Sequence, residues 1–159
     1  MSYIINQNAS PDVVVFMDGD YSDYPEEMVL LLGEIEKGND LVIGSRALGN
    51  SEKGSMTIPQ QFGNWLSGFL IKLIWKQPVS DLGPFRAIKW DKLQDLKMQD
   101  KTFGWTVEMQ IKAIKRKYNY KEIAVNYRKR IGKSKVSGTI KGTLLAGFKI
   151  IFTIIKYAL

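Results

Sequence analysis

Three aspartates follow an apolar run within six positions of one another, in the stretch VVVFMDGDYSDYPEE at residues 13–27. Carboxylates placed this close together can hold a divalent cation, attack a phosphate or cap a helix. Asp18 and Asp20 stand two residues apart where the apolar run ends, so both can reach one hard cation, which in turn can neutralise a diphosphate. A helix cap needs only one carboxylate, and we expect Asp23 to be that cap.

The residue types that are missing narrow the chemistry further. The 159 residues include no His and no Cys, which removes the commonest general base and every thiolate ligand or nucleophile. Acid–base steps must therefore fall to Asp, Glu, Lys or Tyr. A metal must be bound through oxygen, which favours Mg²⁺ or Mn²⁺ over zinc.

Charge is distributed unevenly along the chain. The net charge is +7, yet residues 1–59 carry ten acidic against three basic side chains, whereas residues 112–159 carry thirteen Lys or Arg against one Glu. An acidic part suits a cation, and a basic part suits phosphates or an anionic membrane surface. Nucleic acid is not an expected partner, because no nucleic-acid-binding motif accompanies the basic residues.

Apolar periodicity predicts one α/β domain. The continuous apolar run Val13–Met17 is typical of a buried parallel strand, and a helix with Pro25 in its first turn separates it from a second strand at 40–44. Strand, helix and strand at this spacing predict a βαβ unit and a mostly parallel sheet flanked by helices. A helix at about 60–75 has so wide an apolar stripe that it must be deeply buried or face a partner. The later pattern predicts a short strand at 85–88, helices at 105–117 and 139–158, and a strand within 120–130.

Five sequence blocks occur in a fixed order: MDGDYSDYPEE, DLVIGSR, SDLGPFRAI, TFGWTVEMQIKA and NYRKRIGKSKVSGT. They resemble the ordered motifs of family 2 glycosyltransferases, in the branch close to polyprenyl-phosphate sugar transferases such as dolichyl-phosphate mannose synthase. The resemblance covers nearly the whole chain. It implies a partial GT-A fold, which is Rossmann-like. It also implies metal-dependent, inverting transfer of a sugar from a nucleotide diphosphate to a polyprenyl phosphate or, as the second choice, to a cell-envelope glycan.

The first block has a competing interpretation. VVVFMDGDYS also resembles the aspartyl-phosphate motif of Mg²⁺-dependent haloacid-dehalogenase-type phosphatases, in which the first Asp is the nucleophile and the second the acid. That family needs a later acidic pair of the form Gly-Asp-x-x-x-Asp. No stretch after residue 40 matches it, so the phosphatase stays behind the transferase.

Several site residues follow from the resemblance to the transferases. It implies that Asp18 and Asp20 position the metal and the diphosphate, with Ser22 standing where related enzymes often have a Gln that helps at the metal. Arg46, in GSR, matches a basic residue near the phosphates, although an Arg after a strand can also simply face solvent. Asp81, in SDLGPFRAI, matches the acidic position beside the acceptor.

Asp81 is also the leading catalytic candidate on chemical grounds. A hydroxyl acceptor needs a base, and without His a carboxylate is the natural supplier. A lipid phosphate is already an anion, and Asp81 would then orient the acceptor or bind the metal. Glu108, in GWTVEMQ, is a second catalytic candidate, and its alternative is an ordinary place on a helix surface.

The basic stretch NYRKRIGKSK matches the family pattern from Tyr127 onward. A run of basic residues is usually just solvated, but the match implies a loop that closes over the phosphates of donor or acceptor. Arg can grip phosphate oxygens with two bonds, and Gly132 lets the loop fold close to them. The residues that we assign to the donor diphosphate are Asp18, Arg46, Arg128, Arg130, Ser134 and Lys135.

Residues 138–159 are expected to form an amphipathic, membrane-interfacial helix. Lys141, Lys149 and Lys156 fall within a sector of about 80° at 100° per residue, and most of the remaining face is apolar. Such a helix can lie in a membrane surface with its Lys toward anionic headgroups; packed on the sheet, it would show a Lys stripe to solvent instead. A lipid-linked acceptor favours the membrane, and hence a cytoplasmic protein bound peripherally to the inner face.

Residues 1–137 are expected to be the C-terminal portion of a GT-A domain. Related enzymes begin with an apolar strand and an Asn-Glu loop before further nucleotide-binding strands, whereas only seventeen residues precede Asp18. We therefore expect weak or no transfer by the isolated chain. The alternative is a non-catalytic, membrane-associated remnant in which the Asp pair no longer holds metal.

Overall fold

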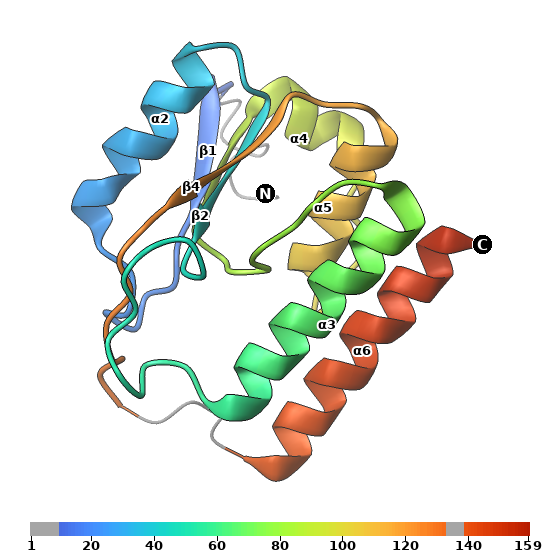
Figure 1. The fold of residues 1–159 in the computed structure, drawn as a ribbon. Coiled ribbons are helices and arrows are strands. Elements are labelled where there is room, and N and C mark those ends of the chain that lie inside the picture. Colours follow the sequence, from blue (N-terminus) through green and yellow to red (C-terminus); the bar gives the residue numbers. More distant parts are fainter. Residues whose placement is uncertain (1–9, 133–138) are drawn as a thin grey trace.

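The computed structural model describes residues 10–132 and 139–159, and it has a four-stranded sheet with helices on both faces (Figure 1). Its elements in chain order are β1 (Val13–Phe16), the 3₁₀-helix η1 (Pro25–Glu27), α2 (Met28–Glu36), β2 (Leu41–Ser45), α3 (Ile58–Trp75), β3 (Arg86–Lys89), α4 (Trp90–Leu96), α5 (Trp105–Lys115), β4 (Tyr120–Ala124) and α6 (Ile140–Ala158). The predicted α/β class and the predicted order of helices and strands are confirmed.

The sheet is mixed, with the strand order β1-β3-β2-β4. β3 runs antiparallel to both β1 and β2, while β2 and β4 are parallel, so β1, β2 and β4 share one direction. β1 and β2 are therefore parallel, as predicted, but they are not neighbours. The cause lies after α3: the chain returns to the end where β2 finishes, with Ser80 Oγ 2.7 Å from Ser45 Oγ, so the next strand must run backwards.

Alternating side chains of the central strands fill a core on each face of the sheet. Val42 and Ala87 pack with Leu31 and Ile35 of α2 on one face. The other face packs against α4 and α5, through Leu41, Ile43, Ile88, Trp90, Leu93, Leu96, Met109 and Ala113. The expectation of a buried parallel strand was wrong for β1, which is an edge strand, is half-buried and pairs antiparallel.

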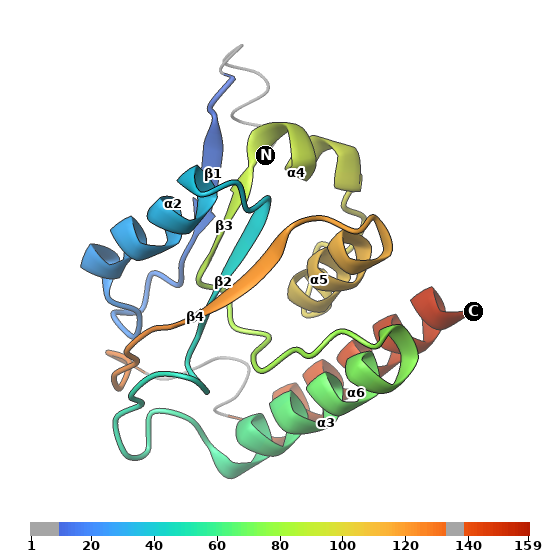
Figure 2. The ribbon, with the colours of Figure 1, turned by 45° about the horizontal axis from the view of Figure 1, so that its top comes forward.

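α3 and α6 form a further layer beyond α5, and they lie side by side in both ribbon views (Figure 2). A third core cluster joins them to α5 and to the segment before β3, through Ile71, Val79, Leu82, Val107, Ile111 and Ile154. Thr57 begins α3 with a capping box, because its hydroxyl accepts the Gln60 N–H and the Gln60 side chain accepts the Thr57 N–H. α3 lies next to the end of the sheet at which β2 finishes, because its Asn64 bonds the Ser80 carbonyl and Ser80 contacts Ser45.

Candidate active site

The loop that follows β1 folds back on itself and holds its own carboxylates. The Ser22 N–H donates to Asp20 Oδ1 over 3.0 Å, and the Ser22 hydroxyl donates to the same oxygen. Asp23 Oδ2 accepts the Asp18 N–H over 3.1 Å. The turn between them places Tyr21 at φ 72°, a left-handed conformation that is uncommon for a residue with a side chain. The loop thus holds Asp18 and Asp20 at the carboxyl end of β1.

The predicted helix cap at Asp23 is wrong. The residues that precede η1 and α2 are Tyr24 and Glu27, and neither helix has a side-chain cap. Asp23 is buried instead, and its carboxylate fixes the Asp18 amide. A cap would have required a side chain turned toward the helix, whereas this carboxylate is turned back toward the start of its own loop.

The basic segment 126–131, which follows β4, lies along this acidic loop. The Arg128 N–H donates to the Ser22 carbonyl over 3.0 Å, and the Ile131 N–H donates to the Asp20 carbonyl over 2.9 Å. Arg130 Nη2 lies 2.8 Å from Asp20 Oδ2. The two segments that carry most of the motif residues are therefore in direct contact, although about a hundred residues separate them in the sequence.

Arg46 and Asp81 form a buried ion pair beside this cluster. Arg46 Nε and Nη2 lie 2.8 and 2.7 Å from the two Asp81 oxygens, which also accept the backbone N–H groups of Arg46 and Gly83. Burial alone would raise the pKa of Asp81, but the hydrogen bonds and charge of Arg46 outweigh it and hold the pKa below its ordinary value. Asp81 is thus an ionised carboxylate that holds Arg46, and it would have to release Arg46 to act as a base.

Electrostatics distinguishes the carboxylates of the acidic loop. Burial, and then the neighbouring Asp20, raise the pKa of Asp18 above its ordinary value. Burial raises the pKa of Asp23 to about 6. Within the described part of the chain the Asp18 carboxylate accepts no hydrogen bond, and Asp23 Oδ1 is buried without a partner. A positive ligand would relieve this concentration of negative charge.

A cavity of about 560 Å³ lies over these groups. Its charged lining is Asp18, Asp20, Arg46 and Arg130, and its apolar lining includes Leu82, Pro84, Phe103, Trp105 and Ile150. Among the described residues no three acidic side chains are grouped as metal ligands. The arrangement fits Mg²⁺ or Mn²⁺ all the same, since such ions are commonly held by one or two carboxylates together with substrate phosphates. Asp18 and Asp20 are the residues that could hold it.

The other predicted site residues lie in different surroundings. Ser22 is fully buried behind Asp20, where its hydroxyl orients that carboxylate. Arg128 contacts the acidic loop but does not line the cavity. Glu108 is also absent from the cavity wall; its carboxylate faces Lys112 and Tyr157. Ser134 and Lys135 lie outside the described residues.

Two supporting residues were not predicted from the sequence. Arg86 is fully buried, and its guanidinium donates to the carbonyls of Leu82, Gly83 and Thr106. Asn64 holds the same turn from α3, since its side chain bonds the Ser80 carbonyl and the Leu82 N–H over 2.9 and 2.8 Å. Arg86 gave a signal, because it is a charged residue inside a short strand that is otherwise mostly apolar; Asn64 gave none, because other polar residues such as Gln61 and Ser67 lie near it in the sequence.

Comparison with known proteins identifies the family. The family model described as glycosyl transferase family 2 matches residues 4–97, which is more than half of the chain. The chain belongs to glycosyl transferase family 2. Relatives include an undecaprenyl-phosphate mannosyltransferase of Micrococcus luteus, 28% identical over 82% of this chain and 56% of the relative. A dolichyl-phosphate hexose transferase of Haloferax volcanii is 31% identical over 80% of this chain and 56% of the relative. The branch indicated by the sequence motifs is confirmed.

A solved structure supports the fold. Glucosyl-3-phosphoglycerate synthase of Mycobacterium tuberculosis, in complex with Mn²⁺, uridine diphosphate and phosphoglyceric acid, matches with a TM-score of 0.68 and 17% identity over 95% of this chain and 50% of that one. At this identity the likeness concerns the fold, which is of the GT-A kind. The chain spans about half the length of these curated and structural relatives.

Proposed function

We propose that this chain supplies the metal, diphosphate and acceptor positions of an inverting glycosyltransferase. The donor is a nucleotide-diphosphate sugar, the acceptor is a lipid phosphate of the polyprenyl type, and the cofactor is Mg²⁺ or Mn²⁺. The observation that carries the proposal is the convergence of Asp18, Asp20, Arg46 and Arg130 on one cavity of about 560 Å³. Two carboxylates beside two guanidinium groups suit a cation that neutralises a leaving diphosphate.

The Arg46–Asp81 pair supports a phosphate acceptor over a hydroxyl acceptor. A hydroxyl has to lose a proton, and the sequence motif makes Asp81 the leading candidate for the base. Both Asp81 oxygens, however, accept hydrogen bonds from Arg46 at 2.7 and 2.8 Å. A phosphate acceptor is already an anion and needs no base. In that case Asp81 keeps its contacts and fixes Arg46, whose guanidinium can bind a phosphate oxygen.

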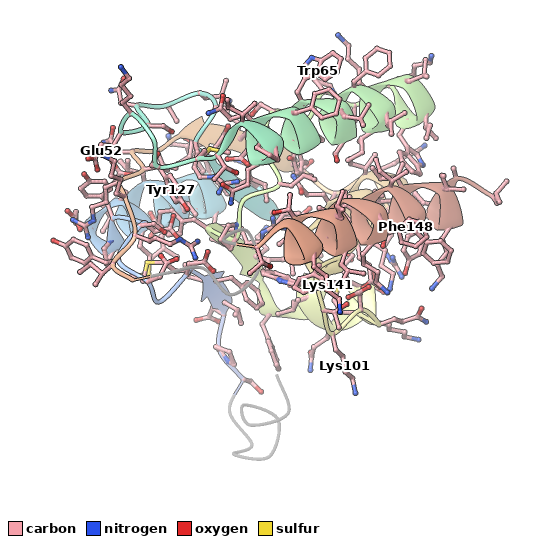
Figure 3. The ribbon with its side chains drawn as sticks, turned by 90° about the horizontal axis from the view of Figure 1, so that it is seen from below. Glu52, Trp65, Lys101, Tyr127, Lys141 and Phe148 are labelled. Carbon is pink, nitrogen blue, oxygen red and sulfur yellow. The ribbon has the colours of Figure 1, made fainter. Side chains whose placement is uncertain are left out.

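An exposed apolar surface beside the cavity supports a lipid-bearing acceptor. The outer stripe of α3 contains Trp65, which is 62% exposed, and that of α6 contains Phe148, which is 70% exposed. Figure 3 shows the two helices side by side, with Trp65 labelled on α3 and Phe148 on α6. The outward apolar residues are Ile58, Phe62, Trp65, Phe69 and Leu73 of α3, with Leu144, Leu145, Phe148, Phe152 and Ile155 of α6. An apolar surface of this extent is typical of a binding face.

We propose that this surface rests on the inner face of the membrane. The wide apolar stripe of α3 was predicted to be either buried or partner-facing, and its exposed residues favour the second alternative. Of the predicted Lys stripe on α6, Lys149 pairs with Asp100 at 2.9 Å, which leaves Lys141 and Lys156 for headgroups. No helix in the described ranges 10–132 and 139–159 is long and apolar enough to cross a bilayer.

Calorimetry tests the cation and donor part of the proposal. We expect Mn²⁺ to bind the purified chain, nucleotide-diphosphate sugars to bind only with Mn²⁺, and Asp20→Ala to remove both. Asp91→Asn is the matched control, because Asp91 is an exposed aspartate at the start of α4. Absence of Mn²⁺ binding would leave the non-catalytic remnant as the better description. Efficient transfer by the isolated chain would refute the expectation that it is weakly active.

Vesicle sedimentation tests the membrane part. Binding to vesicles that contain anionic lipid should fall about tenfold or more in the double variant Trp65→Glu, Phe148→Glu. Each ring would be buried in the membrane on binding, and its loss removes that apolar contribution to the affinity. Val29→Glu is the control, because Val29 is an equally exposed apolar residue on α2. Equal loss in the control would point to non-specific adhesion.

A further inference from the structure

The two arginines of the basic segment contact the acidic loop in different ways. Arg130 meets a carboxylate: its Nη2 lies 2.8 Å from Asp20 Oδ2. Arg128 has no carboxylate partner in the part of the chain that the structure describes; its guanidinium lies over the rings of Tyr21 and Tyr24, at 3.3 and 4.3 Å from their centroids. Two residues that the sequence motif groups as phosphate ligands are therefore in distinct surroundings.

We propose that the two arginines have opposite effects on the affinity for the cation. Arg130 occupies the cation site on Asp20 until a divalent ion displaces it, and Arg128 keeps the acidic loop in the conformation that binds the ion. The inference rests on the proposed function, because it takes Asp18 and Asp20 as the cation ligands.

The argument for Arg130 begins with the two oxygens of Asp20. Oδ1 accepts both the N–H and the hydroxyl of Ser22, so its capacity is taken up within the loop. Oδ2 is the oxygen left for a cation, and it is the one that Arg130 contacts. A divalent ion on Oδ2 and a guanidinium at 2.8 Å would repel each other. The ion and the Arg130 guanidinium therefore compete for this oxygen.

Arg130 can release Asp20 at little cost in stability, and it can then bind the donor. The Arg130–Asp20 pair is partly exposed on both sides, with side-chain exposures of 28% and 23%, and ion pairs of this kind contribute little to stability. The Arg130 side chain also lines the cavity. Once released, its guanidinium can bind a diphosphate oxygen beside the cation. Arrival of the cation thereby makes a second positive group available to the donor.

Arg128 supports the loop from outside the cavity. Its Nε donates to the Tyr21 carbonyl over 2.5 Å and its Nη2 to the Asp23 carbonyl over 3.4 Å, while its backbone N–H donates to the Ser22 carbonyl. Tyr21 is the residue in the left-handed conformation. Arg128 thus fixes three successive carbonyls across the turn that aims Asp20. It is a positioning residue, in the manner of the outer-shell groups that orient metal ligands.

Mn²⁺ affinity of the full chain, measured by calorimetry without nucleotide, tests both roles at once. Arg130→Gln should bind Mn²⁺ about threefold more tightly, because the competing ion pair is gone. Arg128→Gln should bind it about tenfold more weakly, as is usual when an outer-shell partner is lost. Lys129→Gln removes the same charge between them, at a side chain directed to Glu52, and should change the affinity by less than about twofold.

Further measurements keep the test decisive. With uridine diphosphate and Mn²⁺ together, Arg130→Gln should bind the nucleotide more weakly than the parent chain does, the reverse of its effect on the metal alone. Arg128→Lys should recover only part of the affinity, because Lys lacks the planar guanidinium that bonds two carbonyls and contacts both tyrosine rings. Circular dichroism checks folding, and Tyr24→Leu replaces Arg128→Gln if that variant does not fold, since it removes one side of the stack.

The outcomes separate the inference from the proposed function. If the parent chain binds Mn²⁺ and both arginine variants shift the affinity in the same direction, the effect is one of overall charge and the inference is overturned while the proposed function stands. If the parent chain and all variants fail to bind Mn²⁺, the proposed function fails and the inference fails with it.

Discussion

Glu108 provides a decisive test of how a motif residue should be interpreted, because its surroundings are those of a structural carboxylate. It is 1% exposed. Its Oε1 accepts the Gln99 N–H over 3.0 Å and the Tyr157 hydroxyl over 2.8 Å, and lies 2.7 Å from Lys112 Nζ. Its Oε2 accepts the Asp100 N–H over 2.7 Å. The carboxylate thereby joins α5 to α6 and to the loop after α4.

We expect Glu108→Gln to destabilise the fold by about 3 kcal/mol, at the low end of the range for breaking a buried pair. The substitution places an amide NH₂ against donors that need an acceptor, and it leaves Lys112, which is 8% exposed, without its anion. The Lys97 carbonyl, 2.8 Å from Lys112 Nζ, moderates the loss. Because a domain of this size is stable by about 5–15 kcal/mol, the effect is large enough to measure.

The same contacts determine the pH dependence. Burial would raise the pKa of Glu108, but the bonds from Lys112, Asp100, Tyr157 and Gln99 outweigh it and hold the pKa below its ordinary value of 4.5. A carboxyl whose folded pKa lies below the unfolded one stabilises the fold above the unfolded value. This stabilisation is lost as the pH falls through the folded pKa. The difference between parent and Glu108→Gln should therefore be full at pH 7 and shrink below about pH 4.5.

Urea unfolding followed by circular dichroism measures this difference. A double variant, Glu108→Gln with Lys112→Met, should recover part of the loss, since it removes the unpaired ammonium as well. The reasoning is refuted if Glu108→Gln unfolds at the parent's urea concentration while it weakens the binding of a nucleotide-diphosphate sugar in the presence of Mn²⁺. That result would support the role at the site that the motif implies.

Three further substitutions test the supports of the site. Gly49→Ala should destabilise the chain by more than about 2 kcal/mol in urea unfolding, because its Cβ would lie 2.0 Å from the Val125 carbonyl oxygen. Arg86→Met should lower the free energy of unfolding by about 2–4 kcal/mol, since three carbonyls, two of them buried, lose their donor. Arg46→Lys cannot keep the two-oxygen contact with Asp81, and we expect it to weaken nucleotide binding in the presence of Mn²⁺ by about tenfold or more, measured by calorimetry.

Local patterns predicted the elements of this fold well, but they could not predict the sheet order. Apolar runs and caps depend on neighbouring residues, so β2, α3 and α6 were found near their true bounds. The position of β3 depends on where the chain returns after α3, which is fixed by contacts such as Ser45 with Ser80, 35 positions apart. No periodicity in the strand itself encodes that return.

Residue types in the site were predictable, and their pairing was not. Arg46 and Asp81 were both singled out from motifs, yet their mutual ion pair follows only from the approach of two segments in space. Arg128 was grouped with the phosphate ligands because it is basic and lies in the motif. Its direction is set by two tyrosine rings on the acidic loop, which no reading of the basic stretch alone can anticipate.

The meeting of the acidic and basic parts has a cause in the sheet. β1 and β4 are the two outermost strands of the four, but they point the same way, so their carboxyl ends lie at one end of the sheet. The segments that leave them cross that end toward each other and join through the bridge between Asp23 and Tyr127. Opposite charges are thereby held together across the ends of β2 and β3, where Arg46 and Asp81 already lie. Because the two segments are in contact, a substitution in one also affects the other. Stability alone therefore cannot separate the roles of Arg128 and Arg130, whereas the affinity for Mn²⁺ can.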